Sequence, residues 1–346
     1  MKSWVGRRVI KTGMAVFITA FICHLIELPP TFAVITAIVT TEPTAADSIK
    51  KGLIRLPAAA LGAIFAIAAD FVFGQNALTY ALVAMLTIIV CSKLRLDTGT
   101  LVATLTAVAM IPGTTDHAFI DFITRISSTS IGIFVSTFVN FFLLPPRFGP
   151  ILSKRVDYLF AHSGTSLQSI IEEHLSGSIK DRTIFYRQLQ NDLMKASELI
   201  QFQHDEWKYR DSCEFERRSF NYLQKKLDYL HFILFHIGKL SYIRLNQTLS
   251  DSEQNLLHQI GQSFSAILKD PYHQVTTYHY TQIELIKQQK LKYPHSDTFI
   301  NQICHELLSL QKIISELTEV TSDERRFSIE EEKYPTYIFK KEAISE

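Results

Sequence analysis

Apolar residues form six stretches within the first 148 residues of the chain. A helix needs about 20 residues to cross a hydrocarbon core of about 30 Å. Four stretches reach or approach that length: residues 10–28, 53–73, 77–91 and 122–144. Two shorter stretches, residues 31–41 and 100–111, are equally consistent in length with re-entrant or buried segments.

Charged residues between the stretches favour one topology. If all six stretches cross and the N-terminus is cytoplasmic, the following basic residues lie on the cytoplasmic side: Lys2, Arg7, Arg8, Lys11, Lys50, Lys51, Lys93, Arg95, Arg147, Lys154 and Arg155. The opposite loops, residues 27–30, 70–76 and 112–121, contain no lysine or arginine. Because basic residues concentrate in cytoplasmic loops, we predict a multi-pass protein of the cell membrane with both termini in the cytoplasm.

Beyond residue 148 the pattern becomes amphipathic. Apolar residues recur at helical spacing and predict long helices over residues 181–209, 212–245, 251–268, 278–291 and 297–320. Ser250 and Glu253 have the spacing of a capping box. We therefore predict an all-α fold.

The predicted organisation has three parts. A six-span transmembrane domain, residues 1–148, precedes a cytosolic helical bundle domain, residues 149–322. Residues 323–346 contain few apolar residues that could pack, so we expect a disordered tail.

Composition excludes several function classes. The formal net charge is +1, so the chain lacks the excess of basic residues that a nucleic-acid binder carries. The four cysteines are far apart and form no CxxC motif, so they indicate neither a zinc site nor a disulfide framework. Neither GxxxxGK[ST] nor GxSxG occurs. We therefore expect no enzyme activity, no cofactor and no metal site.

The histidines of the second half do not change this expectation. His231 with His236 and His273 with His279 are the closest candidates for metal ligands or catalysis. Neither pair has the i, i+4 spacing that places two ligands on one helical face. We expect them to have surface or packing roles.

The membrane region contains a weak internal repeat. A shift of 70 residues aligns its halves without a gap and pairs Thr44 with Thr114, Arg55 with Arg125, and Gly62 with Gly132. Each half holds three spans, an odd number, so the second half must be inverted relative to the first. In transporters with inverted repeats, short segments at matching positions point to the binding site. Here those segments end in TTEPT, residues 40–44, and MIPGT, residues 110–114.

Two arginines are the main candidates for chemistry within the spans. An intramembrane arginine is costly and usually faces a bundle interior or an aqueous cavity. Arg55 lies near the cytoplasmic end of its span and could equally extend to the interface. Arg125 lies toward the outer end, where its alternative is a local pair with Asp121 one turn earlier.

Small residues follow both arginines along one helical face: Ala59, Gly62 and Ala66, then Thr129, Gly132 and Ser136. Close helix packing is the commoner meaning of such a face. In a pore, the same face would leave room for a solute.

Three segments carry a resemblance to known proteins: TTEPTAADSIKKGLIRLPAAALGA at residues 40–63, RISSTSIG at 125–132 and NFFLLPP at 140–146. They resemble the aromatic acid exporter family, within a fusaric-acid-resistance group that includes plant aluminium-activated malate channels. The resemblance covers the six-span half, and the second half is similar to the helical C-terminal domain of bacterial members. It implies an anion pathway lined by Arg55 and Arg125. Pro57 and Ala58 stand where the family usually has a second glycine.

The sequence thus predicts an integral membrane transporter, an exporter or channel for organic carboxylates, with aromatic acids included in that class. The expected substrate-binding residues are Arg55, Arg125, Glu42, Thr44 and Thr114, and His24 is a candidate proton relay or a buried, hydrogen-bonded imidazole. The expected partners are the lipid bilayer, the organic anion and, because related channels pair, a second copy in a homodimer. The alternative is a structural or regulatory membrane protein that anchors the helical bundle.

Overall fold

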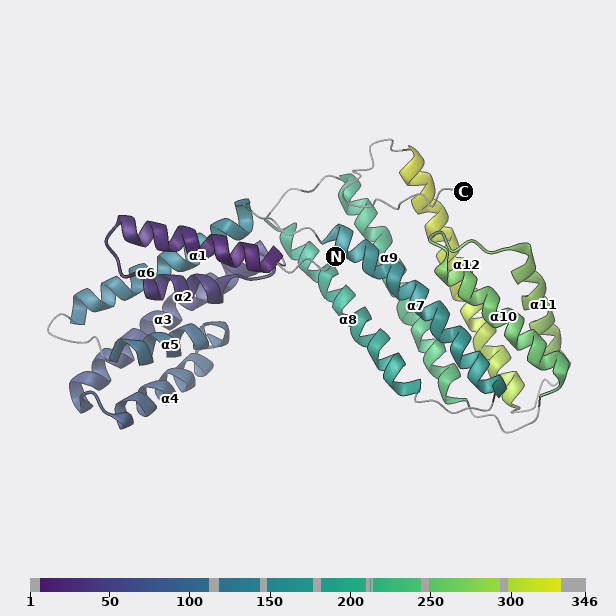
Figure 1. Ribbon diagram of the computed structural model, residues 1–346, viewed down its shortest axis with the longest axis horizontal. Coiled ribbons are helices and arrows are strands. Elements are labelled where there is room, and N and C mark those ends of the chain that lie inside the picture. Colours follow the sequence, from purple (N-terminus) through teal and green to yellow (C-terminus); the bar gives the residue numbers. More distant parts are fainter. Residues whose placement is uncertain are drawn as a thin grey trace. The chain divides into compact units, whose positions relative to one another are not determined.

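The computed structural model describes residues 7–111, 118–143, 148–176, 182–209, 212, 214–243, 249–292 and 298–330. Helices joined by short connections make up the regular secondary structure of these residues (Figure 1). The chain divides into two compact units. The N-terminal unit combines Met1–Pro146 with His204–Asp211, and the C-terminal unit combines Arg147–Gln203 with Ser212–Glu346.

Helices of the N-terminal unit follow the apolar stretches of the sequence. They are α1 (Arg7–Leu25), α2 (Pro30–Thr40), α3 (Ala45–Phe73), α4 (Ala77–Lys93), the short η1 (Asp97–Gly99), α5 (Thr100–Met110), α6 (Ala118–Phe138) and the π-helical η3 (Val139–Leu143). Among the residues that the structure describes, three segments are long and apolar enough to cross a membrane: Arg8–Leu25, Ala45–Phe73 and Phe119–Leu143. Two shorter apolar helices are Pro30–Thr40 and Ala77–Lys93.

The surface of the N-terminal unit is apolar and its interior is partly polar. Phe17 and Phe134 are 71% and 70% exposed, whereas Arg125 and Asn140 are 6% and 1% exposed. Large exposed apolar patches on a soluble monomer are uncommon and mark interaction surfaces. Together with the apolar helices, this distribution fits a membrane protein.

Helix α3 begins at Ala45, eight residues before the start at residue 53 that the apolar pattern predicts. The reason is local capping, because the hydroxyl of Thr44 accepts a hydrogen bond from the amide of Asp47 at 3.0 Å. The charged residues of the first turns lower the hydropathy without disfavouring the helix. Pro57 lies inside α3, where the carbonyl of Leu53 cannot receive its usual helical bond.

Glycines set the closest helix contacts of this unit. A Cβ added to Gly62 of α3 would lie 2.3 Å from the carbonyl oxygen of Ala103 in α5. A Cβ added to Gly132 of α6 would lie 2.4 Å from the carbonyl oxygen of Ala33 in α2. Only glycine permits such an approach of two helix backbones, so α3 packs tightly on α5 and α6 on α2.

The same principle applies where the family's second glycine is missing. Ala58 occupies that part of α3 and is fully buried. A Cβ added to Gly99 of η1 would lie 2.6 Å from the Cβ of Ala58. In this chain the facing segment supplies a glycine that permits the close contact with Ala58.

The C-terminal unit consists of α7 (Gly149–Ser176), α8 (Arg182–Glu206, up to Gln203), α9 (Glu214–Tyr242), α10 (Asp251–Lys269), α11 (Thr277–Lys292) and α12 (Phe299–Glu330). Helix α7 packs on α9 and α10, α9 packs on α12, and α11 joins α12 to α10, which closes a ring of five helices. The predicted capping box at the start of α10 is confirmed, since Ser250 and Glu253 bond reciprocally.

Helix α12 extends to Glu330 and so passes residue 322, where the sequence analysis ends the domain. Aromatic packing explains the extension. The ring of Phe327 stacks on that of Phe215 at 5.0 Å, and the guanidinium of Arg218 lies 4.2 Å from its centroid. Residues 331–346, the rest of the expected tail, lie outside the described residues.

Candidate functional site

Arg125 is the most unusual side chain of the N-terminal unit. It lies in α6 and is 6% exposed. One guanidinium nitrogen, Nη2, donates to the hydroxyl of Thr106 in α5 at 2.9 Å. The guanidinium carbon lies 3.3 Å from the ring centroid of Phe32 in α2. Arg125 thus joins α6 to both short helices, and sequence analysis identified neither contact.

Much of the hydrogen-bonding capacity of Arg125 is unused. Within the described part of the chain, Nε and Nη1 have no hydrogen-bond partner. No ion pair with Asp121 forms among these residues, and Oδ2 of Asp121 also has no hydrogen-bond partner there. One turn after Arg125, the buried hydroxyl of Thr129 has none either. A buried guanidinium with free donors is the side chain that a carboxylate binds best.

Arg55 has a different environment. Its Nη2 donates to Oε1 of Glu42 at 2.6 Å, and its Nε donates to the carbonyl of Thr98 at 3.3 Å. Lys51 approaches the other carboxylate oxygen of Glu42 at 3.0 Å and Asp47 at 3.4 Å. Two basic and two acidic residues therefore form one network, and the charge of Arg55 is balanced within it.

Glu42 follows α2 and lies outside the predicted membrane-spanning stretches. Burial would raise the pKa of Glu42, but hydrogen bonds from Arg55 and Lys51 outweigh this effect and hold that pKa below its usual value. Glu42 is therefore ionised at neutral pH. Its negative charge compensates the buried Arg55.

The two arginines contact opposite ends of the short helices. Arg55 reaches Glu42, which follows the end of α2, and Thr98, which precedes α5. Arg125 reaches Phe32 near the start of α2 and Thr106 in the second half of α5. One charge is balanced and the other is not, so the two ends differ electrostatically.

Asn140 connects three segments near Glu42. Its side-chain amide donates to the carbonyls of Glu42 and Thr44 at 3.1 and 2.8 Å and lies 2.8 Å from the hydroxyl of Ser48. Its Oδ1 accepts from the ammonium of Lys11 at 2.6 Å. This network fixes the TTEPT segment against α1 and η3. In the sequence, only the single asparagine within an apolar stretch indicated it.

The remaining predicted site residues have separate environments. Thr44 is fully buried, and its hydroxyl caps α3. His24 lies exposed in the last turn of α1, so it is not the buried, hydrogen-bonded imidazole considered as an alternative. Thr114 lies outside the described residues.

The N-terminus of α3 has a further partner that sequence analysis missed. The carboxylate of Glu206, 4% exposed, accepts a hydrogen bond from the backbone amide of Ala45. Glu206 belongs to the segment His204–Asp211, which is part of the N-terminal unit although it lies far along the sequence. A carboxylate at a helix N-terminus is favourable because it accepts from free amides and complements the helix dipole.

The small faces beside the arginines serve close packing. Ala59, Ala66 and Ser136 are at most 1% exposed, and the hydroxyl of Ser136 lies 2.6 Å from that of Thr40. With the glycine contacts described above, these residues join α3 and α6 to the short helices.

Comparison with known proteins adds sequence evidence. Residues 3–143 match the model of aromatic acid exporter family member 1. A UPF0421 protein of Halalkalibacterium halodurans is 52% identical, covering 97% of this chain and 95% of its own length. UPF0421 proteins of Bacillus cereus and Staphylococcus saprophyticus are 41% and 34% identical, covering 94% and 90% of this chain and 97% of their own lengths.

Proposed function

This chain belongs to the aromatic acid exporter family. On that premise we propose that it is an integral membrane transporter, an exporter or channel for organic carboxylates, with aromatic acids included in that class. The family is one of exporters, so we propose a transport role rather than a catalytic one. The observation that carries the proposal is the buried guanidinium of Arg125, whose Nε and Nη1 have no partner among the described residues. Such a group favours an anion entering its surroundings.

Arg125 has the larger role in this proposal and Arg55 the smaller. The charge of Arg55 is balanced by Glu42 at 2.6 Å, so it attracts an approaching anion weakly. Arg125 has no such counter-ion among the described residues and retains free donors. Glu42 acts by orienting Arg55, and Thr44 by fixing the start of α3.

We propose six spans arranged as an inverted repeat of three. Exchanging α1 with α4, α2 with α5 and α3 with α6 reproduces the principal packing pairs of the N-terminal unit. The contact of Gly62 with Ala103 has its counterpart in that of Gly132 with Ala33. These pairs differ by 70 residues at both partners, which supports the repeat.

The proposed orientation places both termini in the cytoplasm, which makes the C-terminal unit a cytosolic bundle. Its support is the distribution of lysine and arginine between the loops. We also propose a homodimer, supported by exposed aromatic side chains on α9 such as Phe232, 57% exposed. His24, Glu42, Thr44 and Thr114 stay predictions for the solute path.

Carboxylate flux tests the proposal. Purified protein is reconstituted into liposomes loaded with labelled benzoate or malate, and efflux is compared with that of protein-free liposomes. We expect protein-dependent efflux of at least one carboxylate and no comparable efflux of a labelled amine.

The alternative function is a structural or regulatory membrane protein. The compensated Arg55–Glu42 pair and the tight glycine contacts favour it, since both serve packing. Folded protein that moves no carboxylate in either direction would support this alternative.

A further inference from the structure

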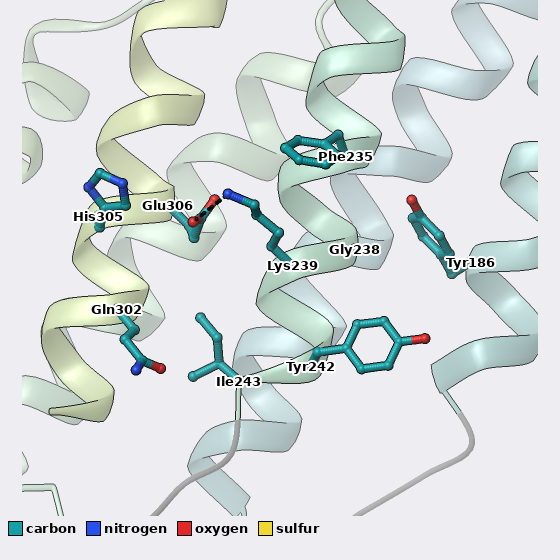
Figure 2. Close-up of a pocket in the computed structure, with 9 residues that line it drawn as sticks. All are labelled: Tyr186, Phe235, Gly238, Lys239, Tyr242, Ile243, Gln302, His305 and Glu306. Carbon is teal, nitrogen blue, oxygen red and sulfur yellow. Dashed lines mark hydrogen bonds and ion pairs between the residues drawn. The ribbon is translucent and has the colours of Figure 1, made fainter. Parts of the chain in front are cut away.

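A cavity of about 560 Å³ lies in the C-terminal unit, away from the groups discussed so far (Figure 2). Helix α9 contributes Phe235, Lys239 and Tyr242, and α12 contributes Gln302 and His305. Tyr186 of α8 lies beside them. The volume falls within the range of small-molecule pockets, about 300–1,000 Å³.

Lys239 supplies a cation to this pocket. Its ammonium lies 3.2 Å from Oε1 of Glu306 and 4.9 Å from the ring centroid of Phe235. The side chain is 47% exposed, so it is accessible to a ligand. Figure 2 shows Lys239 extending from α9 toward Glu306 on α12.

The carboxylate of Glu306 balances the charge of Lys239, so the excess positive charge near this pocket comes from a second lysine. The second oxygen of Glu306 lies 2.6 Å from Nδ1 of His236, so both oxygens are occupied. Burial would raise the pKa of Glu306, but its bonds to His236 and Lys239 outweigh this and lower that pKa. A second cation is close, since the ammonium of Lys290 lies 3.2 Å from Nδ1 of His305. That contact leaves Nε2 of His305 as a donor for a ligand.

Aromatic rings form the other part of the lining. Phe235 and Tyr242 are 55% and 73% exposed, although both carry large apolar surfaces. Tyr186 packs closely on α9 because Gly238 has no side chain there, and a Cβ at Gly238 would lie 2.8 Å from the phenolic oxygen. Burial raises the pKa of Tyr186, which keeps its hydroxyl protonated. Aromatic rings and hydrogen-bond donors therefore line the same pocket.

We propose that this pocket binds a small aromatic carboxylate, with the acid group at Lys239 and His305 and the ring on Phe235 and Tyr242. The lining selects this ligand class independently of the transport proposed above. Aromatic side chains offer flat apolar contact, and a lysine ammonium with free hydrogens offers charge-assisted hydrogen bonds. The C-terminal unit thus acquires a ligand site separate from Arg125.

The test measures benzoate binding by isothermal titration calorimetry on the full chain in detergent. All proteins carry Arg125→Gln, so the membrane arginine does not contribute and a failed transport proposal leaves the measurement intact. We expect one site with a Kd of about 1 mM, as ligand efficiency predicts for so small a molecule. Cyclohexanecarboxylate lacks the aromatic ring, and benzyl alcohol lacks the charge. Each should bind at least about threefold more weakly than benzoate.

Two variants and one control locate the site. Lys239→Gln should weaken benzoate binding about tenfold, and Phe235→Leu about threefold. Lys287→Gln on α11 is the matched control, because Lys287 is exposed and pairs only with Glu284 in the described structure. It should bind benzoate as the parent does. Absence of binding up to 20 times the expected Kd, about 20 mM, or equal binding by Lys239→Gln, overturns the proposal.

Photolabelling provides an independent location. The full chain is irradiated with 4-azidobenzoate, and labelled peptides are identified by mass spectrometry. We expect label on α9 or α12 that excess benzoate removes. Benzoate-sensitive label confined to other helices contradicts the site.

Discussion

Replacing Arg125 with glutamine should remove most anion flux and leave folding intact. Glutamine keeps a polar, hydrogen-bonding side chain near Thr106 and Phe32 but has no charge. A hydrogen bond to a charged group contributes about 1.5–3 kcal/mol. Since 1.4 kcal/mol is a factor of about ten, flux at low substrate concentration should fall about 10- to 150-fold.

Stability should change little in the same variant. The cation–π contact with Phe32, at 3.3 Å, is lost, and such a contact contributes about 2 kcal/mol when desolvated. The cost of burying an incompletely bonded guanidinium disappears at the same time. Because these terms oppose each other, melting in detergent should shift by only a few degrees.

Efflux of labelled benzoate from proteoliposomes is the assay, normalised to folded protein by size-exclusion chromatography. Arg55→Gln is the matched comparison and should show the opposite balance. Flux per folded molecule should fall less, because Glu42 already neutralises Arg55, but stability should fall because Glu42 keeps only Lys51. Adding Asp121→Asn to Arg125→Gln should rescue nothing, since no ion pair joins those residues in the described structure. Normal folding with unchanged flux in Arg125→Gln would refute the anion role.

Three further predictions follow from individual contacts. Glu42→Gln should destabilise the protein by about 3 kcal/mol because a buried arginine loses its partner, and adding Arg55→Met should restore most of that stability in a chemical denaturation series. Gly132→Ala should lower stability by about 1–3 kcal/mol through a backbone clash, whereas Gly13→Ala, with no atom within 4 Å of the new Cβ, should not; equal melting temperatures would contradict the packing. Burial lowers the pKa of His279 in the folded state. As pH falls below about 6.5, the unfolded state therefore binds a proton before the folded state does, and the free energy of unfolding should decline. Melting at a series of pH values should show that His279→Gln lacks this part of the acid dependence.

The apolar pattern predicts the helices well because periodicity reports which face is buried. The apolar pattern misplaces helix ends where specific contacts, rather than apolar periodicity, determine them. Helix α3 starts early because Thr44 caps it, and Glu42 pairs with Lys51 of the same helix. Helix α12 ends late because Phe327 finds aromatic partners that lie over a hundred residues earlier. The spacing of Thr44 and Asp47 is a local signal of a helix start, whereas no residue near Phe327 in the sequence reveals its aromatic partners.

Arg125 was identifiable from the sequence because a charge in an apolar segment needs an explanation. Its surroundings were not, since Thr106 and Phe32 come from other helices. The local alternative, pairing with Asp121, uses the spacing of one helical turn but is not made among the described residues. Spacing along one helix shows which side chains can meet, and tertiary packing decides which of them do.

The carboxylate of Glu206 on the first amide of α3 has a consequence for dividing this chain into fragments. A fragment ending at residue 148 contains every apolar stretch but lacks His204–Asp211, which belongs to the same compact unit. Such a truncation removes an internal component of the unit that it aims to isolate. The segment His204–Asp211 is distant in sequence from the rest of the N-terminal unit but belongs to it. The two halves of the chain, expressed together, could therefore complement one another, whereas the first half alone is incomplete.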